Sequence, residues 1–307
     1  MSTRLIINPT AGAHRAHARL EAHLRTIHAR WPRLEVCTSR SAEHLTELAA
    51  EAARRGLDRV LVAGGDGTVH FVANGLAGSQ TALGIIPVGS GNDIARSVGL
   101  PSDTAAAVAM LVQDHAVAID VGRVKDRVFC CVLGVGMDTP AIQRIQAARV
   151  LRRGKLLYAA ATLRTLLTYR PPQLTIEGES MLFDGPAMFA AVTNTATYAG
   201  GMQICPDADV TDGALDLCAI PQLPMSRLLR AFGSVFDGGH TAMAGVVTRQ
   251  AHRLVLRSPH PLPVTLDGEL TELRTDLEVT VWPGALRLLA NPRFVGVRAQ
   301  APELRAA

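Results

Sequence analysis

The chain has 307 residues, of which 48% are hydrophobic and only 19% are charged. This composition excludes a disordered chain, and the length predicts a large core with two domains rather than one. The net charge of +4 is mild, and no aromatic-rich basic stripe is present, so no nucleic-acid partner is expected.

The sequence predicts a cytoplasmic protein. No run of 18 uninterrupted apolar residues occurs, so no membrane-spanning segment is expected. The start, Met1 to Arg4, leads directly into a short strand and does not look like a signal peptide. The five cysteines are an odd number without paired metal-type spacing, which favours a reduced interior.

The first part of the chain alternates short apolar strands with alanine-rich helical stretches, the pattern of a parallel α/β sheet. A strand over residues 4–7 opens into the turn-rich loop of residues 8–12. A helix over residues 14–30 and a strand ending at Thr38 follow, and Ser41 can cap the next helix.

A glycine-rich turn follows the next strand. Val60 to Ala63 run into Gly64, Gly65, Asp66 and Gly67, and helical spacing begins at Thr68. A strand, a glycine turn and a helix start direct backbone N–H groups at an anion, and glycine lets phosphate oxygens approach closely. Asp66 would repel that anion unless a divalent cation lies between them, so we predict a nucleotide with Mg²⁺. A tight turn capped by Asp66 is the alternative.

A second loop of this kind follows the strand over residues 83–88. It contains Gly89, Ser90, Gly91, Asn92 and Asp93, and a helical stretch comes next. Ligands of an open parallel sheet bind beyond the carboxyl ends of its strands. The loops after residues 7, 63 and 88 should therefore meet at one site.

The pattern changes near Gly122. A hairpin-like stretch over residues 119–133 comes first, and one helix, over residues 225–236, interrupts later strands. Those strands are predicted over residues 173–177, 187–194, 214–220, 253–257, 264–267 and 277–282. We therefore predict an α/β nucleotide-binding domain over residues 1–122 and a mostly β, sandwich-like domain over residues 123–284.

Two acidic loops in the second part are candidates for chemistry. Asp267-Gly268-Glu269 ends a strand, where a carboxylate could take the proton of a phosphoryl acceptor, although D-G-E is also a good hairpin turn. The loop from Asp209 through Asp212 to Ala214 offers the carboxylate and carbonyl oxygens that hard cations take, although it also fits an Asx turn.

The motifs N-P-T-A-G, G-G-D-G-T and G-S-G-N-D, in this order and spacing, resemble those of the diacylglycerol kinase catalytic family, which includes bacterial lipid kinases and sphingosine kinases. The resemblance continues in residues 198–202, 206–208, 212–216 and 267–269 and covers nearly the whole chain. It implies a two-domain ATP-dependent lipid kinase that uses Mg²⁺ and a lipid acceptor. It also implies that a C-terminal strand, at about residues 285–307, returns to the first domain.

The resemblance assigns roles to particular residues. It implies that Glu269 is the base that deprotonates the lipid hydroxyl, acting with Asp66. It implies a supporting Mg²⁺ held by Asp212 and the carbonyl groups of Asp209 and Ala214. The implied nucleotide-binding residues are Asn8, Pro9, Thr10, Ala11, Gly12, Thr38, Gly64, Gly65, Asp66, Gly67, Thr68, Val69, His70, Ser90, Asn92 and Asp93.

One departure keeps alternatives open. After G-G-D-G-T the family usually continues with Asn-Glu-Val, while this chain has His70-Phe71-Val72. The missing Glu removes a charged group close to the nucleotide, which a catalytically degenerate nucleotide-binding regulator would tolerate. An NAD kinase-like enzyme would share the G-G-D-G loop, but D-G-A-L-D and D-G-E resemble the lipid kinases.

A basic segment suggests how the enzyme reaches lipid. No acidic residue lies between Asp138 and Glu177, while arginines alternate with leucines at partly helical spacing. We expect peripheral contact with an anionic membrane at its inner face, or else packing of the leucines against the second domain. The acceptor lipid, the choice of nucleoside triphosphate and a homodimer are left open.

Overall fold

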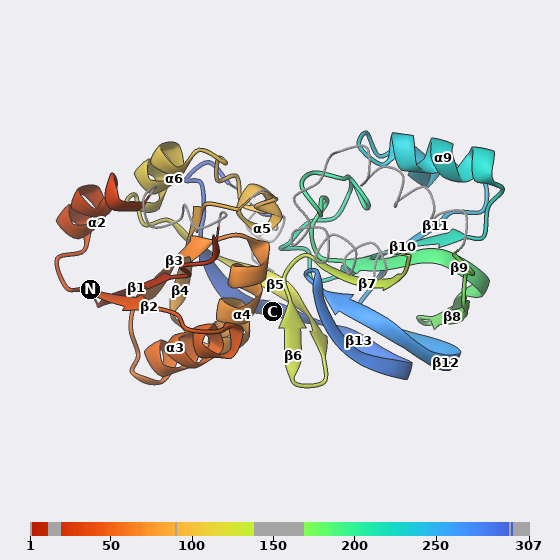
Figure 1. Cartoon of the computed structure of the whole chain (residues 1–307), viewed down its shortest axis with the longest axis horizontal. Helices are drawn as coiled ribbons and strands as arrows, with labels where there is room; N and C mark the ends of the chain where they lie inside the picture. The colour runs from red at the N-terminus through yellow and green to blue at the C-terminus, as the bar shows by residue number, and fades with distance from the viewer. Residues whose placement is uncertain (1, 12–19, 90, 138–168, 295, 297–307) are drawn as a thin grey trace, which may run out of the picture.

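The computed structural model describes residues 2–11, 20–89, 91–137, 169–294 and 296. They form an α/β lobe and a strand-rich lobe that lie side by side (Figure 1). The predicted fold class, a nucleotide-binding α/β unit followed by a mostly β unit, is therefore correct. Gly12, Ser90 and the basic segment as far as residue 168 lie outside the described residues.

The α/β lobe is built on four parallel strands: β1 (Thr3–Ile7), β2 (Leu34–Thr38), β3 (Arg59–Gly64) and β4 (Ala82–Pro87). Their order across the sheet is β4, β3, β1, β2. Every residue of β1, β3 and β4 is buried, which explains why these strands read as continuous apolar runs. The loops after β1, β3 and β4 consequently leave the sheet at one edge.

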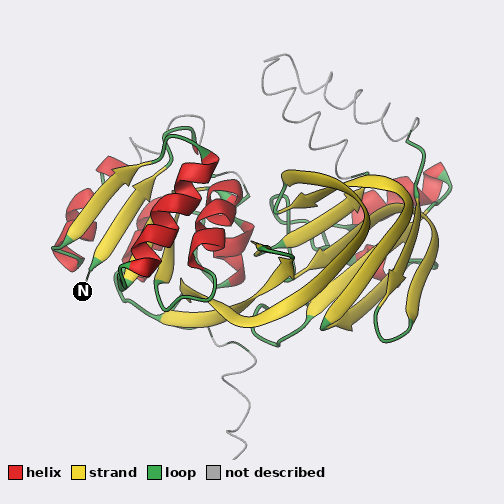
Figure 2. Cartoon of the chain, turned by 90° about the horizontal axis from the view of Figure 1, so that it is seen from below, coloured by secondary structure: helices red, strands yellow, loops and turns green. Residues whose placement is uncertain are grey.

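Helices cover the faces of this sheet (Figure 2). Those described are α2 (Leu24–Arg30), α3 (Ala42–Arg54), α4 (Asp66–Leu76), α5 (Asp93–Ser97) and α6 (Thr104–Leu111). Ser41 caps α3 as expected, because its hydroxyl accepts the His44 N–H at 3.1 Å. The helix expected over residues 14–30 is described only from residue 20, and a turn at residues 22–23 precedes α2.

The strand-rich lobe contains long antiparallel strands and helix α9 (Met225–Ser234). Its strands are β5 (Ala116–Val124), β6 (Arg127–Phe129), β7 (Val132–Gly136), β8 (Gln173–Glu177), β9 (Met181–Thr193), β10 (Leu215–Pro221), β11 (Val247–Ala251), β12 (Arg253–Leu266) and β13 (Glu269–Leu289). The strands expected over residues 253–257 and 264–267 are one strand, β12. Its pairing with β13 shifts register between Arg257 and Val264, where Pro259, Pro261 and Pro263 carry no N–H to donate.

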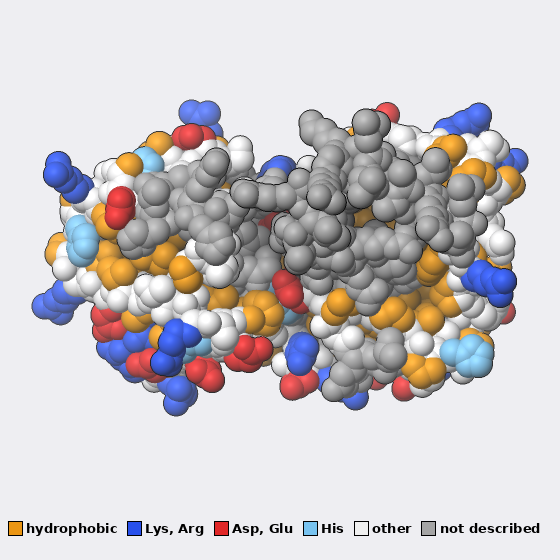
Figure 3. Space-filling model, in the orientation of Figure 1, with side chains coloured by type: hydrophobic (Ala, Val, Ile, Leu, Met, Phe, Trp, Pro, Cys, Tyr) orange, Lys and Arg blue, Asp and Glu red, His pale blue; other side chains and the backbone are white. Residues whose placement is uncertain are grey.

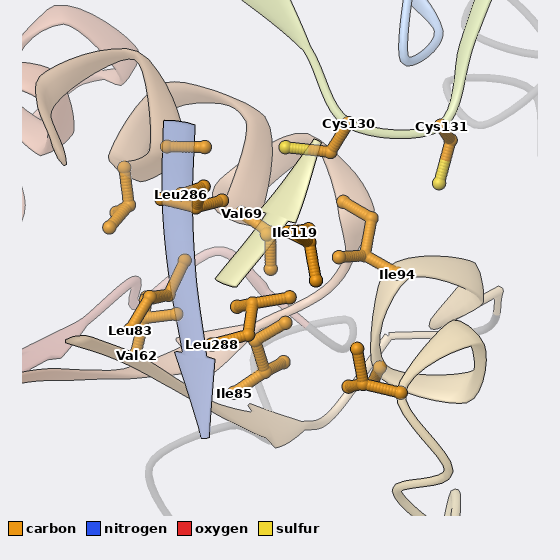
Figure 4. Packing of buried hydrophobic residues seen from close by; sticks show 14 of the residues in the cluster. Val62, Val69, Leu83, Ile85, Ile94, Ile119, Cys130, Cys131, Leu286 and Leu288 are labelled. Carbon is orange, nitrogen blue, oxygen red and sulfur yellow. The ribbon is translucent and has the colours of Figure 1, made fainter. Parts of the chain in front are cut away.

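Strand β13 belongs to both lobes. Its first part pairs with β12, and its last part pairs with β5 and, at Leu288, in parallel with β4. Leu277 lies in the core of the strand-rich lobe, whereas Leu286 and Leu288 pack among side chains of β3 and β4 (Figure 4). The pairing with β5 shifts register between Trp282 and Leu286, around Gly284, whose φ is 62°. The predicted domain boundaries stay predictions, since β5 crosses residue 122 without a break.

Within the described residues, none of the helices has the length and apolar character needed to cross a membrane.

Candidate active site

The three glycine-containing loops meet at the carboxyl edge of the parallel strands. Asn8, after β1, donates its side-chain N–H to Thr68 Oγ1 at 2.9 Å. The loops after β3 and β4 touch backbone to backbone, because a Cβ on Gly89 would lie 2.6 Å from Gly65 Cα. A Cβ on Gly64 would lie 2.4 Å from Thr68 Cβ. Packing within the protein therefore already requires glycine at these positions, whether or not a phosphate binds. The sequence alone indicated only the phosphate-binding reason.

Asp66 is the first residue of α4, and its carboxylate faces α5. Its Oδ1 accepts the Ile94 N–H at 3.2 Å. Its Oδ2 and Asp93 Oδ2 both flank Gly91, since a Cβ there would lie 2.6 Å from the first and 3.2 Å from the second. Burial, and then the charge of Asp93, raise the pKa of Asp66 to about 6. A positive ion beside this carboxylate would relieve that cost.

Asn92 and Asp93 are bound to protein groups. Asn92 has φ of 55°, and its side chain bonds both the N–H and the carbonyl of Gly89, which closes the loop on itself. Asp93 pairs with Arg96 and accepts the Thr197 hydroxyl at 3.0 Å and the Gly200 N–H at 2.7 Å. Asp93 therefore ties the nucleotide-type loop to the strand-rich lobe.

The remaining predicted nucleotide residues differ in exposure. Pro9, Thr10 and Thr38 are exposed at the same edge of the sheet. The Thr10 N–H and hydroxyl both donate to Asn8 Oδ1, and the Ala11 N–H donates to the Asn8 carbonyl. Val69 is buried in the core, and its N–H bonds the Gly65 carbonyl, so its contribution to the site is to hold the start of α4.

The D-G-E sequence forms a tight hairpin turn between β12 and β13. Asp267 and Gly268 have φ of 51° and 86°, as a type I′ turn requires. The Asp267 side chain is fully buried and accepts the N–H groups of Cys130, Cys131 and Val132 at 2.8, 2.7 and 3.0 Å. The turn interpretation is correct, and the turn carries a buried carboxylate as well.

Glu269 follows this turn and lies against the glycine loop. A Cβ on Gly67 would be 2.8 Å from Glu269 Oε1. The two carboxylates predicted to act in catalysis, Asp66 and Glu269, therefore come from different lobes, and Glu269 lies beside Gly67, the residue that follows Asp66 in the first turn of α4. Gly67 has no side chain to separate the loop from Glu269.

His70 lies in α4, one turn after Asp66, and is 4% exposed. Its Nδ1 lies 2.9 Å from Asp267 Oδ2. Phe71 packs edge-on against the His70 ring, with 5.2 Å between centroids. The side chain of His70 thus points at the D-G-E turn.

The acidic loop of residues 209–214 has the hydrogen bonds of Asx turns. Asp209 Oδ1 accepts the Thr211 N–H at 2.8 Å, and Asp212 Oδ1 accepts the Ala214 N–H at 2.9 Å. Asp212 Oδ2 also accepts the Gln250 amide at 2.6 Å. Burial, and then the charges of Asp212 and Asp207, raise the pKa of Asp216 to about 6. The part of the chain that the structure describes has no cluster of three or more His, Cys, Asp or Glu side chains suited to a metal ion.

Asp120 holds the acidic loop and was not among the predicted site residues. Its buried carboxylate accepts the Gly213 N–H at 2.6 Å and the Gly284 N–H at 2.7 Å. The available signal was an Asp within the apolar strand Ile119–Val121, since a charge there needs partners.

Comparisons with known proteins show the family of the chain. A family model described as the diacylglycerol kinase catalytic domain matches residues 2–124. A second, described as the YegS C-terminal NAD kinase beta sandwich-like domain, matches residues 131–290. The chain is 30% identical over 269 residues to a diacylglycerol kinase of Bacillus subtilis, which covers 87% of this chain and 89% of that protein. The chain belongs to the diacylglycerol kinase family.

Other relatives within this family agree. A Mycobacterium tuberculosis diacylglycerol kinase is 35% identical over 261 residues, which make up 82% of this chain and 82% of that protein. A solved structure of a diacylglycerol kinase from Bacillus anthracis superposes with a TM-score of 0.74 at 22% identity, covering 96% of this chain and 98% of that one, which supports the fold. The protein is a lipid kinase, a phosphotransferase with an alcohol acceptor, and its membership of a kinase family implies ATP as the substrate. The NAD kinase-like alternative has in its favour the shared G-G-D-G loop and the description of the second model, while the relatives are named as diacylglycerol or lipid kinases.

The raised pKa of the buried Asp66 carboxylate predicts how the free energy of unfolding depends on pH. Because its folded-state pKa is about 6, raised from 3.8, ionising Asp66 costs folding free energy as pH rises through this interval. Asp66→Asn should therefore gain stability relative to wild type between pH 4 and pH 6, by about 1–3 kcal/mol at the plateau. Urea unfolding at a series of pH values measures this. Asp126→Asn, in the exposed turn after β5, is the control. A difference for Asp66→Asn that does not vary with pH would contradict the prediction.

Proposed function

We propose that this lipid kinase transfers the γ-phosphate of ATP to the hydroxyl group of diacylglycerol or a closely related lipid, with Glu269 as the general base. The observation that carries the proposal is the contact of Glu269 with Gly67, which brings a carboxylate of the strand-rich lobe to the glycine loop. The relatives named diacylglycerol kinases support this choice of acceptor.

The nucleotide phosphates would bind at the start of α4. The first N–H groups of a helix have no partner within the helix, and the positive end of the helix dipole favours an anion there. Helix α4 begins at Asp66 directly after Gly64 and Gly65, and the Asn8–Thr68 hydrogen bond holds the first loop beside it. Among the described residues, Asn92 and Asp93 lie in the loop that packs against Gly65 and Asp66, and Thr38 is exposed at the end of β2.

Mg²⁺ fits this site through Asp66. In phosphoryl-transfer sites Mg²⁺ is bound by one or two carboxylates together with phosphates and water, so a cluster of three protein ligands is not required. Burial, and then the charge of Asp93, raise the pKa of Asp66, so a cation bound beside it would stabilise the charged carboxylate. The ion supplies neutralising charge to the phosphates. Asp212, with the carbonyl groups of Asp209 and Ala214, would hold a supporting ion, because carboxylate and carbonyl oxygens are the ligands that hard cations take.

The transfer step requires that the acceptor lose its proton. Glu269 would take the proton of the lipid hydroxyl while the hydroxyl oxygen forms a bond to the γ-phosphorus and the bond to the leaving ADP oxygen breaks. Its place beside Gly67 puts the base close to the helix start that would hold the phosphates.

The test is phosphoryl transfer by the purified protein. With ³²P-labelled ATP, Mg²⁺ and diacylglycerol in mixed micelles, wild type should form labelled phosphatidic acid. Glu269→Gln should lose about 10²–10⁴-fold in kcat because a general base is removed, while calorimetry should find ATP affinity unchanged.

Asp126→Asn, in the exposed turn after β5 and away from the proposed nucleotide, metal and base residues, serves as a folded control that should keep most of the rate. Wild-type turnover by Glu269→Gln would require a different base. If the protein phosphorylates another lipid of a total lipid extract but not diacylglycerol, that other lipid is the acceptor and the proposed acceptor is wrong.

We also propose peripheral contact with the anionic inner face of the membrane. The basic segment that first suggested it lies mostly outside the described residues, but α9 offers a second basic and apolar surface. Leu229 and Phe236 are 49% and 57% exposed, Arg227 and Arg230 are exposed beside them, and α9 contains no acidic residue. Hydrophobic and basic side chains lie together at this end of the molecule (Figure 3). The cytoplasmic location stays a prediction, as does a homodimer, which sedimentation velocity would detect.

Reversal of both arginines in α9 tests this contact. Each basic residue near an anionic bilayer contributes on the order of 1 kcal/mol, so Arg227→Glu with Arg230→Glu should weaken binding to phosphatidylglycerol vesicles by at least about 10-fold. Vesicle co-sedimentation at low and physiological salt measures it. Reversal of Arg253, exposed on β12 beside Glu278, is the control. Equal binding by both variants would exclude α9 as the contact surface.

A further inference from the structure

His70 occupies a position from which it can align the two lobes. It projects from α4, the helix that starts at the glycine loop, and its ring nitrogen Nδ1 reaches Asp267 Oδ2 at 2.9 Å. The two residues are 197 positions apart in the sequence. Asp267 is two residues before Glu269 and forms the turn from which Glu269 projects.

The carboxylate of Asp267 accepts four hydrogen bonds. Three come from backbone N–H groups at residues 130–132, which belong to the strand-rich lobe. The fourth comes from His70, in the α/β lobe. A buried carboxylate with donors on both oxygens is held in one orientation, and hydrogen bonds to a charged acceptor are stronger than neutral ones. The backbone donors fix the turn within its own lobe, and His70 joins it to α4.

We infer that His70 is a positioning residue: through Asp267 it holds Glu269 against the glycine loop, so that the base meets the nucleotide and the lipid hydroxyl. The inference rests on the proposed role of Glu269. It gives a physical role to the departure at residues 70–71, where the family resemblance predicts Asn-Glu. The Asn side-chain nitrogen and His Nδ1 are the same number of bonds from Cα, so both residues can offer a donor at this place.

Small displacements of a base have large kinetic effects, since misplacement by about 1 Å can cost about 10²-fold in rate. Removal of the His70 ring should therefore lower kcat while leaving ATP binding unchanged, because His70 contacts the base turn and not the proposed phosphate site. His70→Ala should lose about 10–100-fold in kcat, with the KM for ATP within about threefold of wild type. His70→Asn keeps a donor at the Nδ1 position and should recover most of the rate. His70→Gln moves the donor one bond further out and should not.

The experiment measures kcat, the KM for ATP and the calorimetric ATP affinity of these three variants, alone and in the Glu269→Gln background. If His70 acts through Glu269, His70→Ala should cost almost nothing further once Glu269 is Gln. The matched control is Asn74→Ala. Asn74 lies one turn further along α4 and also joins the lobes, through hydrogen bonds of 3.0 and 2.9 Å with the backbone of Val128. Its side chain also donates to the His70 backbone carbonyl at 2.8 Å, but it makes no hydrogen bond to Asp267 or to the His70 ring. It should lower thermal stability and leave kcat within about threefold.

Each outcome decides between distinct accounts. A full kcat loss for His70→Ala that persists in the Glu269→Gln background, or an equal loss for Asn74→Ala, would overturn the positioning role. A large fall in ATP affinity would make His70 a nucleotide-site residue instead. If Glu269→Gln itself keeps wild-type turnover, the proposed base fails independently of His70. Should His70→Ala not fold, the contrast between His70→Asn and His70→Gln carries the same test.

Discussion

The active-site arrangement depends on one buried carboxylate, that of Asp267. A charge taken out of water is tolerated only when it is paired and hydrogen-bonded, and Asp267 meets that condition with three backbone N–H groups and His70. Those donors come from both lobes and converge on a turn whose backbone angles suit few residues. The turn therefore has one stable position, and Glu269, which follows it, lies at the glycine loop as a consequence.

Other constraints keep the lobes in the same relation. Strand β13 contributes leucines to both cores and so links the two lobes through one continuous strand. Asp93 ties the loop after β4 to Thr197 and Gly200, and Asn74 ties α4 to β6. Phosphoryl transfer is mainly a matter of positioning and charge stabilisation, and these contacts would hold the proposed phosphate site and the proposed base beside each other.

Much of this could be predicted from the sequence, because the relevant signals are local. Apolar runs ending in glycine predicted β3 and β4, and D-G predicted the hairpin turn before Glu269. The sequence predicted two strands, over residues 253–257 and 264–267, whereas the structure has one strand, β12, whose pairing with β13 is interrupted between them except at Leu262. The contacts of Gly65 with Gly89 and of His70 with Asp267 join residues that are far apart in the sequence, so no local sequence pattern predicts them. The family resemblance therefore predicted that His70 binds the nucleotide, whereas in the structure its side chain faces the D-G-E turn.

The most direct test of this account is the kinetics of Asp267→Asn. The amide keeps the size of the side chain but can set an N–H₂ group against the donors that now converge on the carboxylate, which loosens the turn. The account predicts a folded protein with a lowered melting temperature, ATP affinity within about threefold of wild type by calorimetry, and kcat reduced by about 10²-fold or more. A folded Asp267→Asn protein with wild-type kcat would show that the position of Glu269 does not depend on Asp267, and would contradict the account.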